Sequence, residues 1–286
     1  MIILDGGMGN ELLKRTNIPS AGLWSAQFLL DSPNLVEEVH QDYINAGAKV
    51  ITTNTYSTIP SYLSKQNASH LMEELIIKAG SIAREVSNSN LKKNILVAGG
   101  LPPLDESYRP DLVPNKDIAV PIYEKMITLL NPFVDFFICE TISSINESSH
   151  VLNALKNTAL ADKKIWLSWT LLEDKNCKLR SGESIEEAFN FAEKFNPDAY
   201  LFNCTDPEAI TEGLKTLKKL TDKPIGAYPN VFGVPYDWTL DNKVEVDPRN
   251  LTVEQFVQYK DVWEEIGAEI VGGCCGIGPD YISAIS

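Results

Sequence analysis

The sequence predicts an α/β fold, a (β/α)₈ TIM barrel that forms one domain over residues 1–286. Two observations support this prediction. About eight short apolar runs follow one another along the chain, with amphipathic helical patterns between most of them. A joint also recurs, in which a helical run ends at Gly or Asn-Pro and an apolar strand follows. Eight strands alternating with helices over this length favour a closed barrel over an open doubly wound sheet, which stays the alternative.

The expected strands are the apolar runs that suit a parallel sheet buried on both faces. They are Ile2–Leu4, Val50–Thr53, Ile95–Ala98, Phe133–Cys139, Ile165–Trp169, Ala199–Phe202, Pro224–Ala227 and Glu269–Val271. One helix between them has clear boundary signals. Asp31 and Ser32 stand before Pro33 as a cap, and Gly47 follows the end of the helix.

Composition disfavours several classes of partner. Lys and Arg total 25 against 39 Asp and Glu, which gives a formal net charge of -14. Because this excess repels phosphate backbones and anionic lipids, we expect neither nucleic acid nor a membrane surface as a partner. The first residues lack the features of a signal peptide, and no apolar run has the length of a membrane span. We therefore expect a cytoplasmic protein.

Unusual residues gather at the carboxyl ends of the predicted strands, where a (β/α)₈ barrel has its active site. They are Asp5-Gly6-Gly7 after the first strand, Thr53-Asn54-Thr55-Tyr56 after the second, Glu140-Thr141 after the fourth, Asn203-Cys204 after the sixth, Tyr228-Pro229-Asn230 after the seventh and Gly272-Gly273-Cys274-Cys275-Gly276 after the eighth. Packing alone does not explain this placement.

Three of the five cysteines stand at these strand ends. Cys274 and Cys275 are adjacent, and neighbours joined by a trans peptide do not easily form a relaxed disulfide. In a reducing compartment we expect metal ligands or reactive thiols, not a disulfide framework. Two thiolates from one Gly-rich turn, with Cys204 as a third, match a catalytic zinc site that keeps an open position. The alternative is that cysteine is a small core residue, which we expect for Cys139 and Cys177.

Two acidic residues stand at the same predicted edge. Asp5 is often a turn former in such a context, and Glu140 could cap the helix that follows. Together they could instead hold a substrate ammonium, while Gly6 and Gly7 offer backbone N–H groups. Three histidines fall in helical segments, and we expect them to be surface or packing residues and not ligands: His40, His70 and His150.

In their order along the chain, these motifs resemble those of the homocysteine S-methyltransferase family. They are ILDGGMGNELLKR at the start, LWSA, VHQDYINAGAKVITTNTY, Glu140-Thr141, FNC ending at Cys204, YPN and GGCCG. The resemblance covers nearly the whole chain. GGCCG with an upstream Asn-Cys is its specific part, whereas the Asp-Gly-Gly start alone is weak. The family implies a (β/α)₈ barrel that transfers a methyl group to the sulfur of homocysteine and forms methionine.

The resemblance also implies a role for each residue. The family's zinc ligands match Cys204, Cys274 and Cys275. The family's homocysteine-binding residues match Asp5 and Glu140 for the amino group, Gly6 and Gly7 for the carboxylate, and Thr53 and Asn203 for the shape of the pocket. On the donor side, Trp24 matches a tryptophan near the onium group in the betaine-using branch, and Tyr56 is expected beside it. An indole face suits a sulfonium through cation–π attraction, although Trp24 could instead only pack its loop.

Three departures from the family pattern lie in loops at the mouth. They are Ile277-Gly278-Pro279 after GGCCG, GGLPPLDESYRPDLVPN after the third strand and Val231-Phe232-Gly233 after YPN. The expected zinc and homocysteine residues are intact, so these departures bear on the methyl donor. Stand-alone barrels of this length resemble the branch that uses S-methylmethionine or S-adenosylmethionine. We find no appended folate or cobalamin module, and we expect a monomer.

Three alternatives stay open. One keeps the chemistry but uses betaine as donor or selenocysteine as acceptor. A second is a barrel that binds zinc or a thiol metabolite without turning it over. A third is a redox protein in which Cys274 and Cys275 act as a thiol pair.

Overall fold

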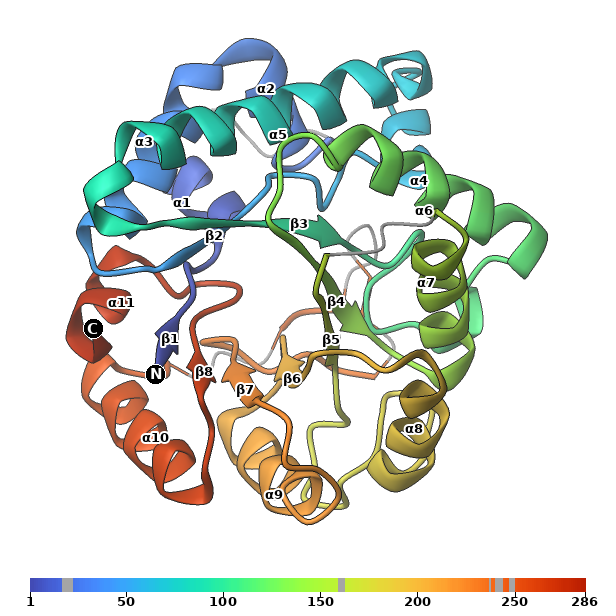
Figure 1. Ribbon diagram of the computed structural model, residues 1–286, viewed down its shortest axis with the longest axis vertical. Helices are drawn as coiled ribbons and strands as arrows, with labels where there is room; N and C mark the ends of the chain where they lie inside the picture. Colours follow the sequence, from blue (N-terminus) through green and yellow to red (C-terminus); the bar gives the residue numbers. More distant parts are fainter. Residues whose placement is uncertain (17–22, 159–162, 237, 240–243, 247–249) are drawn as a thin grey trace.

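Eight parallel strands form one barrel in the computed structural model, which describes residues 1–16, 23–158, 163–236, 238–239, 244–246 and 250–286 (Figure 1). The strand order is β1-β8-β7-β6-β5-β4-β3-β2. A parallel bridge between Leu4 and Val50 joins the two ends of this order, so the sheet closes on itself. The predicted (β/α)₈ barrel is confirmed. The strands are β1 Ile2–Ile3, β2 Val50–Thr52, β3 Leu96–Leu101, β4 Phe136–Ile142, β5 Ile165–Trp169, β6 Ala199–Asn203, β7 Ile225–Tyr228 and β8 Ile270–Val271.

The helices surround the strands (Figure 1). Among the described residues they are α1 Met8–Lys14, α2 Ala26–Asp31, α3 Pro33–Asn45, α4 Pro60–Ser64, α5 Met72–Ser89, α6 Lys116–Leu130, α7 Ile145–Asn157, α8 Ile185–Ala192, α9 Pro207–Leu217, α10 Val253–Ile266 and α11 Pro279–Ile285, with short 3-10 helices at Ser69–Leu71, Leu91–Lys93, Pro110–Leu112 and Glu193–Phe195. No helix in these ranges is long and apolar enough to cross a membrane.

Two apolar layers hold the barrel together. A small buried cluster contains side chains such as Leu4, Val50, Phe136 and Trp166, which fill the inside of the barrel. A much larger cluster lies between the strands and the surrounding helices. Since both faces of the sheet are covered, the strands consist of nearly continuous apolar runs, and this made them visible in the sequence.

Two strands differ by three residues at an end from their predicted boundaries, whereas β5 agrees at both ends and the other strands differ by one residue at one or both ends. β3 was expected to end at Ala98, but it continues through Gly99 and Gly100 to Leu101. Here glycine is not a break: a Cβ on Gly100 would lie 3.0 Å from the Glu140 carboxylate, so the strand passes close to a side chain of its neighbour. β4 was expected over Phe133–Cys139, but it occupies Phe136–Ile142.

Helix α3 begins and ends where the sequence predicted, but its cap differs. Ser32 occupies the N-cap position, and its side chain makes no capping hydrogen bond. Pro33 therefore marks the start without help from the serine hydroxyl. Gly47 follows the end of the helix with φ +114°, a left-handed conformation that glycine adopts without strain.

The residues expected to serve packing are mostly buried. His40 on α3 and His150 on α7 are 0% and 4% exposed, whereas His70 is exposed at the surface. Cys139 is fully buried within β4, and Cys177 is half-buried in the loop after β5. These placements confirm that the histidines are packing or surface residues and that Cys139 is a core residue.

The contact between α9 and α10 gives a test of the outer layer. The Trp263 indole N–H donates to the Thr211 hydroxyl at 2.8 Å, and both side chains are buried. Thr211→Val keeps the shape but leaves the indole N–H without a partner, so we expect the free energy of unfolding to fall by about 1–3 kcal/mol. Thr216→Val is the matched control. Its hydroxyl bonds only the backbone of the same helix, and a loss below about 0.5 kcal/mol is expected.

Thermal unfolding of the two variants measures this difference, at roughly 2–4 °C per kcal/mol for a chain of this size. Equal melting temperatures for the two variants would contradict the importance of the Trp263–Thr211 bond.

Candidate active site at the barrel mouth

The carboxyl ends of the strands surround a cavity of about 400 Å³. All the predicted site residues except Asn203 line it: Asp5, Gly6, Gly7, Trp24, Thr53, Tyr56, Glu140, Cys204, Cys274 and Cys275. The only charged side chains among the described lining residues are Asp5 and Glu140. The cavity is therefore acidic, which favours a cationic ligand.

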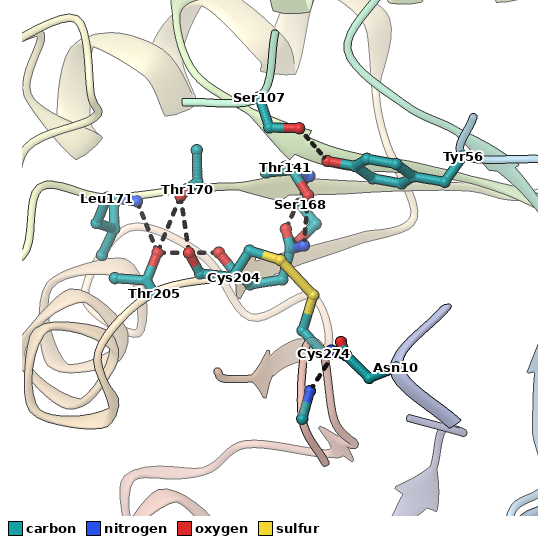
Figure 2. The surroundings of a disulfide bond; sticks show 12 residues. Asn10, Tyr56, Ser107, Thr141, Ser168, Thr170, Leu171, Cys204, Thr205 and Cys274 are labelled. Carbon is teal, nitrogen blue, oxygen red and sulfur yellow. Dashed lines mark hydrogen bonds between the residues drawn. A yellow bond between two sulfur atoms is a disulfide. The ribbon is translucent and has the colours of Figure 1, made fainter. Parts of the chain in front are cut away.

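The three predicted metal ligands converge. The Sγ atoms of Cys204, Cys274 and Cys275 all lie within 4.8 Å of one another. Cys204 follows β6 with φ +50°, and this left-handed turn directs the chain at the strand end. The other two cysteines follow β8, and Figure 2 shows Cys274 beside Cys204. Sulfur ligands lie about 2.3 Å from a zinc ion, and so about 3.8 Å from each other around a tetrahedral centre. The three sulfurs are therefore close enough to share a metal, after small side-chain shifts, when they are reduced.

Two of these sulfurs are joined in the structure. A disulfide links Cys204 to Cys274, with the Cα atoms 5.7 Å apart, while Cys275 is free. The sequence predicted no disulfide framework and did not foresee this single bond, which is also not the pair that the redox alternative named. The physical reason is proximity, since thiols close enough to share a metal are also close enough to oxidise. A disulfide sulfur is not a thiolate, so this bond and a three-cysteine metal site exclude each other.

Backbone contacts fix the turn that carries Cys274 and Cys275. The Gly273 N–H donates to the Asp5 carbonyl at 2.9 Å, and the Cys274 N–H donates to the Pro229 carbonyl at 2.9 Å. The Gly276 N–H donates to the Asn10 side chain at 3.2 Å. Elements next to β8 on both sides thus hold the two cysteines at the cavity.

The two carboxyl groups differ in how they are held. Both Asp5 oxygens accept hydrogen bonds from Thr52, one from its N–H at 2.7 Å and one from its hydroxyl at 3.2 Å. Burial nevertheless raises the pKa of Asp5 to about 7. Burial, together with the nearby charge of Asp5, raises the pKa of Glu140 to about 8. A bound ammonium group would remove this penalty by pairing with the two carboxylates.

Glu140 was expected after the fourth strand, but it lies within β4. The register between β4 and β5 shifts between Cys139 and Ile142, and Thr141 adopts φ +57° at this irregularity. A bulge of this kind redirects a side chain next to an active site. The bulge therefore explains how a residue inside a strand lines the cavity.

Asn203 holds this bulge in place. Its side-chain oxygen accepts from the Thr141 N–H at 2.8 Å and from the Ser168 hydroxyl at 2.7 Å. Its amide donates to the Thr141 hydroxyl at 2.8 Å. Figure 2 shows Thr141 and Ser168 beside the Cys204–Cys274 pair. Asn203 was predicted to shape the pocket, and the structure gives it contacts with β4 and β5 behind the cavity wall.

The glycine pair differs from its expected use. A Cβ on Gly6 would lie 2.3 Å from the Ile277 carbonyl oxygen, and one on Gly7 would lie 2.6 Å from the Cys274 carbonyl oxygen. Both positions therefore require glycine. The Gly7 N–H, however, donates to Ile277 at 3.0 Å, so it is not offered to a substrate as predicted.

Trp24 and Tyr56 lie where the donor side was expected. The Trp24 ring packs against Gly9, where a Cβ would lie 2.5 Å from the indole nitrogen. Trp24 thus has both of the placements that the sequence left open, because it packs against α1 and also lines the cavity. The Tyr56 hydroxyl shares a hydrogen bond of 2.7 Å with Ser107 (Figure 2).

Several lining residues escaped the sequence analysis. They include Thr52, Tyr62, Tyr108, Phe232 and Trp238. Thr52 is the last residue of β2, and nothing in its sequence pattern marks it as a partner of Asp5. Tyr108 and Phe232 do lie in segments that depart from the family pattern. That departure was the available signal, but loop residues have no periodicity that would place them.

Comparison with known proteins gives one consistent result. Residues 2–286 match the homocysteine S-methyltransferase family. Homocysteine S-methyltransferase 3 of Zea mays is 31% identical over 305 residues, covering 99% of this chain and 88% of the relative. Selenocysteine methyltransferase of Astragalus bisulcatus is 31% identical over 313 residues, covering 99% and 90%.

Solved structures agree with the sequence relatives. The homocysteine methyltransferase MmuM from Escherichia coli has been solved in a metallated form, with a TM-score of 0.82, 27% identity and coverage of 100% of this chain and 95% of that one. Its oxidized form has a TM-score of 0.83, 27% identity and coverage of 100% and 94%. With a family match over nearly every residue and a barrel mouth that gathers the family's motifs, the chain belongs to the homocysteine S-methyltransferase family.

Proposed function

We propose that this protein transfers a methyl group from a sulfonium donor, S-methylmethionine or S-adenosylmethionine, to the sulfur of homocysteine and forms methionine. The observation that carries the proposal is the convergence of three cysteine sulfurs and two buried carboxyls in one cavity. The first set suits a thiol-activating metal and the second suits an amino group. Homocysteine carries both a thiol and an amino group.

We propose that the metal is zinc, held by Cys204, Cys274 and Cys275 in their reduced state. Thiolate ligands select soft or borderline metals, and three protein ligands leave a position for a substrate sulfur. When bound, zinc lets the homocysteine thiol ionise near neutral pH. A free thiol with a pKa near ~8.5 is only about 3% ionised at pH 7.

The chain's own residues bind and orient the amino acid. Asp5, fixed by Thr52, and Glu140, fixed by the bulge that Asn203 holds, receive the ammonium group. Because the Gly7 N–H is bonded to Ile277, the carboxylate is left to other backbone N–H groups of the stretch Gly6–Asn10, which lines the cavity. These contacts aim the thiol at the three cysteines.

Charge favours a sulfonium as donor. In the transfer, the bond from the donor sulfur to its methyl carbon breaks as the homocysteine sulfur bonds that carbon. The donor leaves as a neutral thioether, and the thiol proton is released. Asp5 and Glu140 are the only charged side chains among the described lining residues, so an anionic donor finds no charged partner there. The indole face of Trp24 suits the cation.

Selenocysteine is a second candidate acceptor. A relative named for that reaction is 31% identical to this chain, as similar as the relative named for homocysteine. Selenocysteine carries the same ammonium and carboxylate groups and a more acidic side chain. We propose further that the protein acts as a single-domain monomer in the cytoplasm, because one chain supplies the cavity lining.

Turnover tests the proposal directly. Reduced, zinc-loaded protein is given homocysteine with S-methylmethionine, S-adenosylmethionine or betaine, and methionine is measured with and without a chelator. We expect methionine from a sulfonium donor, its loss with chelator and its return with zinc. An absence of turnover with every donor, despite bound zinc, would leave a binding barrel instead of an enzyme.

Metal content tests the ligand set. We expect about one zinc per chain in the reduced protein, and loss of zinc and activity together in Cys275→Ala, because two thiolates hold zinc far less tightly than three. Cys177→Ala is the matched control, since that cysteine lies outside the cavity. Oxidation that closes the Cys204–Cys274 bond is expected to release the zinc. Stoichiometric zinc in Cys275→Ala or in the oxidised protein would contradict these ligands.

The Glu140→Gln variant tests two effects of this carboxyl group separately: its part in homocysteine binding and its effect on stability. Removing one carboxylate is expected to raise the KM for homocysteine at least about tenfold while zinc content stays unchanged. The same change should stabilise the metal-free, reduced protein at pH 8.5. The reason is that the raised pKa of Glu140 makes its ionisation a cost to folding as pH rises from about 4.5 through 8.

The gain in melting temperature is therefore expected to shrink on going from pH 8.5 to pH 5, where the wild-type carboxyl keeps its proton in the folded state. Thermal unfolding at both pH values and homocysteine kinetics provide the two measurements. An unchanged KM would remove Glu140 from the site.

A further inference from the structure

Tyr108 covers the three cysteines from the loop after β3. Its side chain is 4% exposed, and it packs in one small cluster with Cys204, Cys274 and Cys275. The residue adopts φ +67°, a conformation that is uncommon for a bulky side chain and costs free energy. The surrounding contacts must hold it there.

Arg180 supplies one of these contacts. Its guanidinium lies over the Tyr108 ring, 5.0 Å from the ring centre, and Arg180 is itself only 1% exposed. It donates to the Val234 carbonyl at 2.9 Å and to the Glu173 carboxylate at 3.1 Å. Arg180 does not line the cavity, whereas Tyr108 does. The guanidinium therefore lies behind the ring as seen from the cavity.

Two other loops contact the Tyr108 ring and the neighbouring Ser107. The Trp238 ring meets the Tyr108 ring edge-on, with the centres 5.8 Å apart. Ser107, the residue before Tyr108, bonds the Tyr56 hydroxyl at 2.7 Å (Figure 2). The loops after β2, β5 and β7 thus all hold the tip of the loop after β3.

The transfer places the donor beside this ring. The reacting sulfur and methyl carbon must approach to about 3–3.5 Å. The homocysteine sulfur lies next to the cysteines that Tyr108 covers, so the donor must enter against Tyr108. The cavity of about 400 Å³ has to hold both substrates. S-adenosylmethionine has more than twice the non-hydrogen atoms of S-methylmethionine, which makes its fit depend on this wall.

We propose that Tyr108 restricts the donor to a small sulfonium compound, and that Arg180 positions the Tyr108 ring. This inference rests on the proposed function, since it concerns the donor side of the same site. Tyr108 acts by its shape. A guanidinium behind the ring withdraws electron density from it, so the ring is a poorer receptor for a second cation than Trp24.

Donor selectivity tests the proposal. The ratio of kcat/KM for S-adenosylmethionine to that for S-methylmethionine is measured for the wild type and for Tyr108→Ala, Tyr108→Phe, Arg180→Lys and Trp238→Leu. We expect the wild type to prefer S-methylmethionine and Tyr108→Ala to shift the ratio at least about tenfold towards S-adenosylmethionine. Tyr108→Phe keeps the ring and should keep the preference. Arg180→Lys and Trp238→Leu are expected to shift it by smaller factors in the same direction.

The control is Tyr236→Leu, an aromatic in the same loop as Trp238 that is 59% exposed and does not line the cavity. Its ratio should equal that of the wild type. The KM for homocysteine is expected to stay within about twofold in every variant, because a donor wall does not touch the amino acid. General damage to the protein would instead lower both donor activities in proportion and leave the ratio unchanged.

The outcomes are distinct. If Tyr108→Ala does not fold, the donor ratio of Trp238→Leu tests the proposal instead, because Trp238 is half-exposed and its substitution is better tolerated. An active wild type whose ratio is unchanged in the folded variants, or which prefers S-adenosylmethionine, overturns this inference and leaves the proposed function standing. A wild type that turns over neither donor overturns both.

Discussion

The side-chain amide of Asn203 is the contact on which the site depends. It satisfies the Thr141 N–H and hydroxyl together with the Ser168 hydroxyl, so three neighbouring strands are tied at their carboxyl ends. These bonds help to hold Thr141 in its left-handed conformation. The bulge at Thr141 turns Glu140 towards the cavity, and the residue after Asn203 is Cys204. One buried amide thus sets the position of a carboxylate and of a cysteine sulfur at once.

The cavity buries ionisable groups whose charged forms are unfavourable until a ligand binds. Two carboxyls are buried near each other, and burial raises the pKa of the Cys275 thiol to about 11. Neither carboxyl has a basic partner among the described lining residues. In the proposed function a metal and an ammonium group supply the missing positive charge, which is why the folded state bears this cost. Such a conflict between stability and binding is typical of active sites.

The sequence predicted the barrel because each buried strand is a continuous apolar run, and β5 agrees with its predicted bounds at both ends. It also placed the cysteines and Asp5 correctly, because the carboxyl ends of parallel strands meet at one edge. Glu140 was placed in a loop because a bulge leaves no signal in local hydrophobicity. The role of Tyr108 depends on Arg180, more than seventy residues later, and single-sequence periodicity does not reveal such pairings. Free N–H groups of Gly6 and Gly7 were predicted from their place after the first strand and from the family resemblance, whereas the Ile277 carbonyl accepts from the Gly7 N–H.

The pairing of the first strand with the last has a consequence for how the protein is made. Ile2 pairs with Ile270, and the turn that carries Cys274 bonds the carbonyl of Asp5. Nearly the whole chain must therefore be synthesised before these partners can meet. Contacts so distant in sequence form slowly, and until β8 is in place the edges of β1 and β7 that pair with it stay open. The thiol of Cys204 is also synthesised long before the two cysteines that complete its site. The nascent protein is thus most exposed to aggregation and to wrong thiol chemistry just before the barrel closes.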